Sequence, residues 1–181
     1  MPDGAFQVHG LSESFLADHP VFAEIVTDGS APLVWDYLIV TFAQEPEPRT
    51  SFEFEDLWHI GRPVEDPEAS GGTAVRLVPG FHPRDWSSSG PDRVLPAGGW
   101  VAELRYRAPE GAPSPEECLE IAVAGSAAPL VCEPLPATGA GYGTLRVPFE
   151  LGRAAPLRLR VFFAGRREVV LDRVTLERPP E

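Results

Sequence analysis

The chain contains no lysine. All 15 of its basic residues are arginines, against 27 acidic residues, and the formal net charge is −12. An acidic chain without a basic cluster is a poor candidate for binding nucleic acid or an anionic membrane surface. No apolar run reaches the length of a membrane span, and residues 1–4 lack the charged and apolar regions of a signal peptide. We therefore expect a protein that stays inside the cell or forms part of a larger exported chain.

Cysteine is also scarce, with only Cys118 and Cys132. Both lie seven residues from Gly125, so a hairpin turning at Gly125 would place them directly opposite each other. Facing cysteines form a cross-strand disulfide in an oxidising compartment, or remain two buried thiols in a reducing one. The sequence leaves both alternatives open. Two thiols without a suitably spaced histidine make a poor zinc site.

Turn residues are abundant, with 21 prolines and 17 glycines between short apolar stretches, and 43% of the residues are hydrophobic. This composition is typical of an all-β sandwich and too apolar for a disordered chain. A last strand is expected at 169–177, and strands at this spacing predict two packed antiparallel sheets. Four earlier segments alternate with a period of two, which places these apolar residues in four inward rows: Trp100, Ala102, Leu104 and Tyr106; Leu119, Ile121 and Val123; Leu145, Val147, Phe149 and Leu151; Leu157, Leu159, Val161 and Phe163.

The first 50 residues carry weaker signals. Strands are expected at 21–27 and 33–42, and one or two helical turns at 12–18. Proline alternates with charge at 44–49, as in a linker. We divide the chain into an N-terminal extension, 1–50, to which no role is assigned, and a β-sandwich domain, 51–181.

The most informative segment is 51–56, in which Glu53 and Glu55 alternate with Phe52 and Phe54. In an extended strand the phenylalanines point to one face and the glutamates to the other. Carboxylates held so close repel unless a cation lies between them or one is protonated, and hard oxygen ligands suit calcium. The alternatives are a solvated edge strand and a catalytic pair. The catalytic alternative is less favoured, because glycosidase carboxylates flank the substrate from separated elements.

Further motifs follow the glutamates in order: Ala-Ser-Gly-Gly at 69–72, a strand starting at Trp100, Thr-Gly-Ala-Gly-Tyr at 138–142, and Leu-Asp at 171–172. This order resembles the galactose-binding-like jelly rolls among carbohydrate-binding modules, in particular families 6 and 35. The resemblance covers 51–178. It implies a β-sandwich jelly roll that serves as a non-catalytic carbohydrate-binding or accessory domain, with a glycan or polysaccharide as its partner.

In that family, two glutamates of the opening strand and an aspartate of the closing strand bind a structural calcium ion. Carried over by position, the ligands are Glu53, Glu55 and Asp172. The alternation of the closing strand places Asp172 in an apolar row with Val170 and Val174, where a lone carboxylate is costly unless an arginine or a metal pairs with it. We expect the opening and closing strands to lie side by side, which would bring the three carboxylates together.

Ligand sites in the family lie in the loops at one end of the sandwich or on a concave sheet face. A sugar site needs aromatic platforms and a few polar groups, which makes these residues the candidates: Trp58, Phe81, His82, Arg84, Asp85, Trp86 and Tyr142. Two departures from the family count against sugar binding. Val169 and Val170 stand where many members carry a ligand-holding asparagine, and Tyr142 replaces a tryptophan.

Two other functions therefore stay open. The first is a structural or protein-interaction module that packs against a neighbouring domain or a second copy of the chain. The second is a hydrolase that uses Glu53 or Glu55, which would require a cleft around those residues. The observation that separates the first from sugar binding is whether Trp58, Phe81, Trp86 and Tyr142 are exposed together at one end of the sandwich.

Overall fold

The computed structural model describes residues 48–109 and 114–179. The chain divides into two compact units, Met1–Gln44 and Glu45–Glu181, and the described residues belong to the second. The strands and helical turns expected at 12–42 lie outside the described residues. In the described part, no helix is long and apolar enough to cross a membrane.

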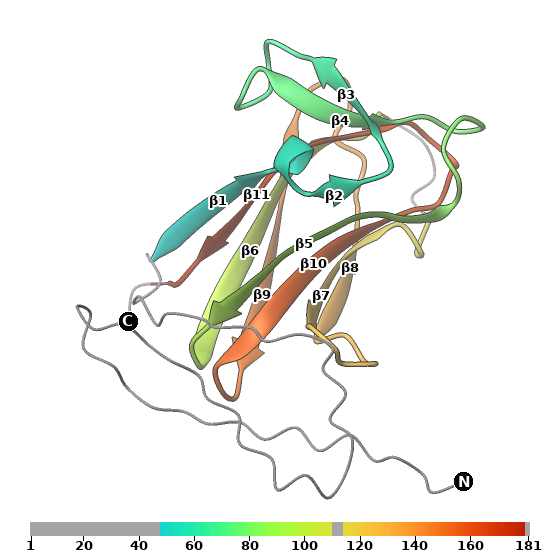
Figure 1. The fold of residues 1–181 in the computed structure, drawn as a ribbon. Helices are drawn as coiled ribbons and strands as arrows, with labels where there is room; N and C mark the ends of the chain where they lie inside the picture. The colour runs from blue at the N-terminus through green and yellow to red at the C-terminus, as the bar shows by residue number, and fades with distance from the viewer. Residues whose placement is uncertain (1–47, 110–113, 180–181) are drawn as a thin grey trace, which may run out of the picture. The chain divides into compact units, whose positions relative to one another are not determined.

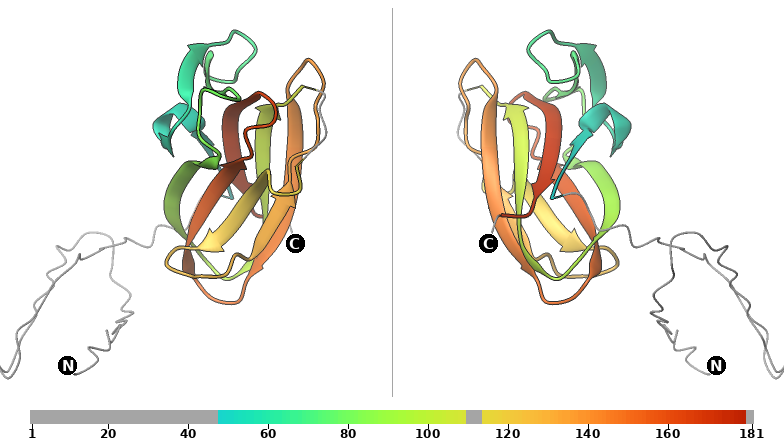
Figure 2. Two further views of the ribbon diagram at one scale, coloured as in Figure 1. Left: turned by 90° about the vertical axis from the view of Figure 1, so that its right-hand side faces the viewer. Right: turned by 90° about the vertical axis from the view of Figure 1, so that its left-hand side faces the viewer.

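Two antiparallel sheets form a sandwich (Figures 1 and 2). The first sheet has the order β3-β4-β11-β6-β9, with β1 beside β11, and the second has the order β2-β5-β10-β7-β8. The strands of the first are β1 Arg49–Glu53, β3 Arg62–Glu65, β4 Thr73–Leu77, β6 Gly98–Arg107, β9 Gly143–Leu151 and β11 Val169–Glu177. Those of the second are β2 Trp58–His59, β5 Asp85–Leu95, β7 Cys118–Val123, β8 Val131–Pro134 and β10 Ala155–Phe163. A 3-10 turn, η1 Phe54–Asp56, joins β1 to β2.

The core lies between the two sheets and includes the inward rows that the sequence predicts, together with apolar residues of β4, β5 and β11. Trp100 and Tyr106 of β6 face Leu119 of β7 and Phe163 of β10 across it, and all four are at most 2% exposed. Val123 is half-buried at the end of its row. The all-β sandwich class is confirmed, because apolar side chains alternate with polar ones along β6, β9 and β10 and only one face of each strand can be buried.

The prediction of one extended strand over 51–56 is wrong beyond Glu53. β1 runs antiparallel to β11 and ends where Glu53 pairs with Arg173. The next part of that edge of β11 is already taken by β4, which pairs with Val169–Leu171. The chain therefore turns away into η1, where the Leu57 N–H donates to the Phe54 carbonyl at 3.2 Å. The expected neighbourhood of the opening and closing strands is confirmed.

The closing strand changes face midway, so the predicted row of Val170, Asp172 and Val174 is also wrong. The pairing of β11 with β6 shifts register between Leu171 and Arg173, and a bulge of this kind moves the following side chains to the opposite face. Val174 therefore lies in the sandwich core. Val170 instead packs in a separate cluster outside it, with Ala69, Ala74 and Tyr142.

Cys118 and Cys132 form a disulfide that joins β7 to β8. They are not directly opposite each other, because Cys118 pairs with Pro134 and Cys132 pairs with Glu120. The hairpin turn lies about one residue beyond the predicted position, and its Ser126 N–H donates to the Val123 carbonyl at 2.9 Å. Of the two alternatives for the cysteines, the structure contains the disulfide.

Candidate functional site

Glu53 and Glu55 converge on the loop between β3 and β4, although the strand ends between them. Gly71 in this loop lies against both carboxylates. A Cβ atom added to Gly71 would be 3.4 Å from Glu55 Oε1 and 3.8 Å from Glu53 Oε2. The absent side chain therefore leaves room between the loop and the two glutamates.

Asp172 lies beside the same loop and is fully buried. Its Oδ1 accepts from the backbone N–H of Ser70 at 2.9 Å and from the Ser70 hydroxyl at 2.8 Å. The Ser70 oxygen is also 2.8 Å from Glu53 Oε2, so Ser70 connects the two acids. The other oxygen of Asp172 pairs with the guanidinium of Arg105. Asp172 is therefore paired with an arginine, which is one of the two alternatives that the sequence left open. This ion pair lies next to the two glutamates.

Glu55 has the least satisfied carboxylate of the three. Burial raises its pKa above the ordinary value, and the charges of Glu53, Asp56 and Asp172 raise the pKa further. Its Oε2 is buried without a hydrogen-bond partner among the described residues. This oxygen lies next to two other acids, and no described hydrogen-bond donor compensates its negative charge. The carboxylate oxygens of Glu53, Glu55 and Asp172 are ligands of the kind that suits a hard cation. As it stands, the described part of the chain has no group of three or more His, Cys, Asp and Glu side chains arranged to hold a metal ion.

Tyr142 belongs to a second polar cluster next to these acids. Its hydroxyl donates to Asp66 Oδ2 at 3.0 Å, and the guanidinium carbons of Arg105 and Arg107 lie 4.3 and 5.1 Å from its ring centroid. Burial opposes ionisation of Asp66, but hydrogen bonds from the Glu68 N–H and Tyr142 and the charge of Arg107 lower its pKa overall. The hydroxyl and the ring of Tyr142 are therefore both engaged inside the domain.

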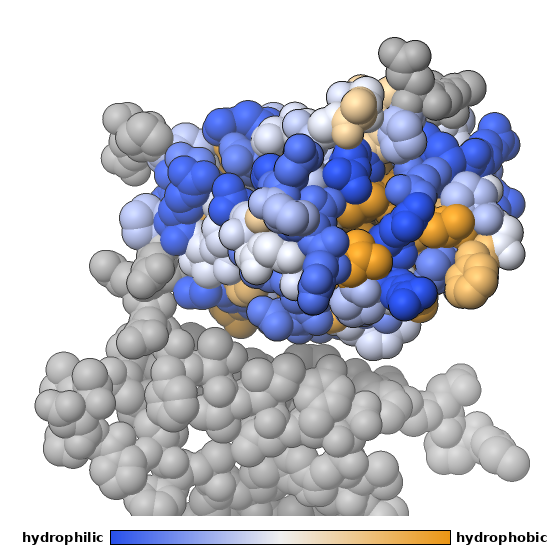
Figure 3. All heavy atoms as spheres, turned by 90° about the horizontal axis from the view of Figure 1, so that it is seen from above, coloured by the Kyte–Doolittle hydropathy of each residue, from blue (hydrophilic) through white to orange (hydrophobic). Residues whose placement is uncertain are grey.

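The loop between β4 and β5 holds three further candidates. Phe81 is 82% exposed, whereas the ring of His82 accepts from the backbone N–H of Val78 through Nδ1 at 2.9 Å. Arg84 pairs with Glu116 at 2.5 Å on the surface. Seen from the end where β3 and β4 lie, the visible described surface is mainly hydrophilic with apolar residues in small areas (Figure 3). Phe81 is thus the one candidate of this loop with a largely solvent-exposed ring.

A row of paired residues crosses the outer face of the second sheet, which we define as the face turned away from the first sheet. Trp58 of β2 pairs with Ser89 of β5, Ser89 pairs with Arg160 of β10, and Arg160 pairs with Glu120 of β7. Directly paired residues of antiparallel strands share a face. Because the residues on either side of Arg160 are buried in the core, this row lies on the outer face.

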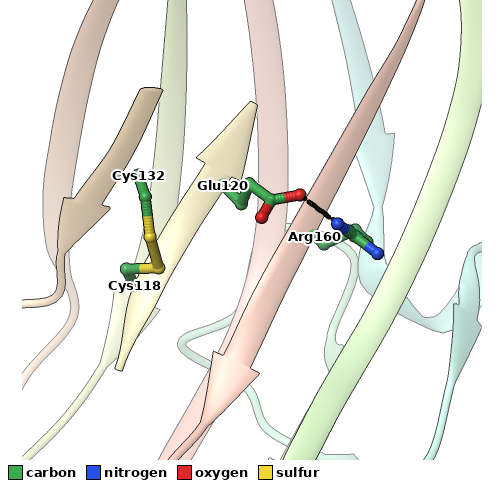
Figure 4. Close-up of a disulfide and its surroundings, with 4 residues drawn as sticks. All are labelled: Cys118, Glu120, Cys132 and Arg160. Carbon is green, nitrogen blue, oxygen red and sulfur yellow. Dashed lines mark hydrogen bonds and ion pairs between the residues drawn. A yellow bond between two sulfur atoms is a disulfide. The ribbon is translucent and has the colours of Figure 1, made fainter. Parts of the chain in front are cut away.

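Trp86 lies next to this row and is half-buried. Its ring meets that of Phe162 edge to face, with centroids 5.3 Å apart, and the guanidinium carbon of Arg160 is 4.1 Å from the Trp86 centroid. Arg160 in turn donates from Nε to Glu120 Oε1 at 2.8 Å, as Figure 4 shows. The Trp86 ring therefore contacts both the Phe162 ring and an anchored cation.

Trp58 is 59% exposed and borders a recess between β1, η1 and β5 with a volume of about 550 Å³. Ser89, Pro91 and three acids, Glu53, Asp56 and Asp92, also line this recess. The volume is within the range of small-molecule sites, about 300–1,000 Å³. Both oxygens of Asp92 accept from the guanidinium of Arg158, at 2.7 and 2.8 Å, so the outer face and the recess together offer aromatic, donor and acceptor groups.

The structure therefore separates the seven candidate ligand residues. Trp58 and Trp86 share the outer face, and Arg84 reaches it, with its guanidinium carbon 5.8 Å from the Phe162 centroid. Asp85 begins β5 and accepts from the backbone N–H of Trp86 at 2.7 Å. Tyr142, Phe81 and His82 lie elsewhere.

Sequence reasoning missed Arg160, Glu120 and Phe162. The alternation along β10 shows that Arg160 and Phe162 point outward. It cannot show that β5, and with it Trp86, is the neighbouring strand. Which strands lie next to each other is determined by the strand order of the sheet, and the alternation of residue types along one strand does not reveal that order.

No protein-family model and no curated protein matches this chain. Among solved structures, its fold is that of the β-sandwich jelly rolls of carbohydrate-binding modules of families 6 and 35, as the sequence resemblance implies. One is a family 35 carbohydrate-binding module from Clostridium thermocellum, with 18% identity over 71% of this chain and 98% of that one and a TM-score of 0.53.

Two further structures show the range of these matches. A carbohydrate-binding module of Cellvibrio mixtus lichenase 5A, solved in complex with cellotriose, has 18% identity over 72% of this chain and 98% of that one, with a TM-score of 0.52. An exo-β-1,3-galactanase from Phanerochaete chrysosporium, solved with galactose, has 16% identity and a TM-score of 0.53 over 71% of this chain. The match spans only 29% of that enzyme. At such identities, the likeness establishes the fold.

Proposed function

We propose that the domain is a non-catalytic carbohydrate-binding domain whose ligand lies on the outer face of the second sheet, over Trp86 and Trp58. The observation that carries this proposal is the Trp86 ring, which Arg160 and Phe162 hold at the surface of a strand. Rigid aromatic rings with nearby polar groups are the usual ingredients of a small-ligand site. The recess beside Trp58 adds space for a further sugar unit.

The loop end of the sandwich is the weaker location. Tyr142 and His82 already use their polar groups inside the domain, and Arg84 is paired with Glu116. The asparagine position of the family is filled by Val169 and Val170, which are both fully buried. Of the candidate residues at this end, Phe81 is the one whose aromatic ring is largely exposed.

The charges on the outer face favour a neutral glycan over an acidic or basic one. Arg160 is paired with Glu120, and Arg158 is paired with Asp92, so each cation lies beside an acid. Each of these two pairs carries no net charge, and the two guanidinium groups and the carboxylate of Asp92 offer hydrogen-bond donors and acceptors to sugar hydroxyls. We therefore assign neutral oligosaccharides as the ligand class.

Replacing Trp86 by alanine should weaken glycan binding by about 2 kcal/mol, or roughly thirtyfold in Kd, because an anchoring aromatic is lost. A glycan array followed by calorimetry with the best ligand measures this. Phe81→Ala removes an exposed ring from the loop end and is the matched control, expected to bind as the unmodified protein does. If the unmodified protein binds no glycan, a structural or protein-interaction module is the better description. If Phe81→Ala weakens binding more than Trp86→Ala does, the ligand lies at the loop end.

We further propose a structural calcium ion held by Glu53, Glu55 and Asp172. Three observations support it: the unpartnered Oε2 of Glu55, the raised pKa of that acid, and the side-chain-free Gly71 beside both glutamates. A bound calcium ion would supply positive charge to these oxygens. The residues come from β1, η1 and β11, so the ion would tie the start of the domain to its last strand.

Calcium at one hundred times its dissociation constant should raise the free energy of unfolding by about 2.7 kcal/mol. Thermal melts with calcium, magnesium or a chelator measure this, and an unchanged Tm in calcium would refute the ion. Without calcium, the raised pKa of Glu55 means that the folded chain holds this proton more tightly than the unfolded chain. Stability should therefore fall as the pH rises through the interval between the unfolded and folded pKa values.

Glu55→Gln provides the matched test of the site. The substitution should remove the pH-dependent loss in chelator and should also remove the gain in calcium, so the sign of its effect on stability reverses between the two conditions. Glu150→Gln, on the exposed face of β9, should change neither the pH-dependent loss of stability in chelator nor the gain of stability in calcium. A calcium response that Glu55→Gln leaves intact would place the ion elsewhere.

A further inference from the structure

The disulfide lies on the same outer face as the proposed glycan site. Glu120 pairs with Cys132 across β7 and β8 and with Arg160 across β7 and β10, so all three side chains share the outer face. Cys118 is two residues before Glu120 in the same strand and therefore also points outward. Figure 4 shows the disulfide next to Glu120, with Arg160 on its other side.

Glu120 lies under this face and is shielded from solvent. Its side chain is 8% exposed, whereas that of Arg160 is 31% exposed. Both Nε and Nη2 of Arg160 donate to the same oxygen of Glu120. Glu120 is therefore too buried to serve as the main contact of a ligand, but it fixes the position of Arg160.

β8 depends on the disulfide more than the inner strands do. It is four residues long, and three of them are exposed. It is also an edge strand, and among the described strands it pairs only with β7. Short exposed edge strands open more readily than core strands, and Cys132 is itself exposed to reductant. Without the disulfide, β8 would separate more often from β7 and admit water to Glu120, which weakens its ion pair with Arg160.

We propose that the Cys118–Cys132 disulfide is a functional part of the outer face: it keeps Glu120 shielded, Glu120 fixes Arg160, and Arg160 positions the Trp86 ring. The effect on affinity rests on the proposed function, whereas the effect on Trp86 does not. A phosphine reduces the disulfide in a two-electron step. The disulfide takes up the two electrons and becomes two thiols, and the phosphine takes its oxygen from water and becomes the phosphine oxide. This reduction therefore loosens Trp86 and lowers glycan affinity, while the core on the other face of β7 stays packed.

Fluorine NMR on protein labelled with 5-fluorotryptophan tests the positioning step without a ligand. The Trp86 signal, assigned with Trp86→Phe, should shift or broaden on reduction, and the signal of the buried Trp100 should not change. Cys118→Ala/Cys132→Ala should reproduce the reduced spectrum without a reductant. An unchanged Trp86 signal would overturn the proposal, and so would equal changes at Trp86 and Trp100, which would indicate general loosening.

Titration with cellotriose, and with the best array ligand, tests the consequence for binding. Reduction should raise Kd about tenfold, by the loss of an anchored side chain, and Glu120→Gln should do the same with the disulfide intact. Reduction of the disulfide in the Glu120→Gln variant should raise Kd little further, because the substitution and the reduction act on the same contacts. Glu133→Gln, an exposed acid on β8, is the matched control. Unchanged affinity after reduction overturns the functional step. Absence of binding before reduction refutes the proposed function instead and leaves the fluorine result to decide the positioning step.

Discussion

Replacing Arg167 by methionine is expected to lower the free energy of unfolding by about 3–5 kcal/mol, because it leaves a buried carboxylate without its cation. The side chains of Arg167 and Glu117 are 5% and 1% exposed. Arg167 donates from Nε to Glu117 Oε2 at 2.6 Å and from Nη2 to the Leu135 carbonyl at 2.6 Å. The pair thus fastens the segment before β11 to the segments before β7 and after β8.

Denaturant unfolding of Arg167→Met, Glu117→Leu and the double variant measures the interaction free energy between Arg167 and Glu117. One oxygen of Glu117 and one nitrogen of Arg167 have no hydrogen-bond partner among the described residues, so the native pair is incompletely satisfied. Replacing both partners by apolar side chains should therefore recover most of the stability that either single change removes. A double variant as unstable as the sum of the two single variants would show that the pair has no mutual dependence.

Asp172→Asn should destabilise the domain by about 3 kcal/mol, because it breaks an ion pair with one fully buried partner. Its carboxylate accepts from Ser70 and pairs with Arg105, which connects the β3–β4 loop to β11 and β6. Arg105 is 27% exposed, so solvent partly compensates the cation that remains. The measurement is denaturant unfolding in chelator, which separates this effect from any bound calcium.

Glu116→Gln is the matched control for Asp172→Asn. Its partner is Arg84, and both side chains are about half exposed, so the loss should stay below about 1 kcal/mol. If the two substitutions cost the same, the buried position of Asp172 adds nothing to stability.

The period-two rows of β6, β9 and β10 were predictable because each strand has one buried and one solvated face, and the residue types alternate accordingly. β5 was not predictable in the same way. Gly90 and Pro91 interrupt it, and proline lacks the N–H that continues a strand ladder. Gly90 and Pro91 pair with Leu159 and Arg158 of β10, and the register shifts directly after Pro91, where Asp92 is left unpaired in the ladder.

The candidate site divides along similar lines. The proximity of Glu53, Glu55 and Asp172 was implied by the family resemblance, which places the opening strand beside the closing strand, although the path of the chain between the glutamates was not. The bulge in β11 could not be predicted from the sequence, because it depends on the pairing with β6 and not on the local sequence. The contact between Trp86 and Arg160 likewise depends on which strands are neighbours, since these residues are far apart in the chain.

One edge of β11 is shared by two strands, β4 along its first part and β1 along Arg173–Glu177. A truncated protein that starts after Glu53 would lose β1 while keeping nearly all of the sandwich core. The peptide groups along the second part of that edge would then face solvent without partners, and such an edge can pair with a strand of another molecule. We therefore expect the five residues of β1 to protect the domain against strand exchange and aggregation, and an expression boundary belongs before Arg49.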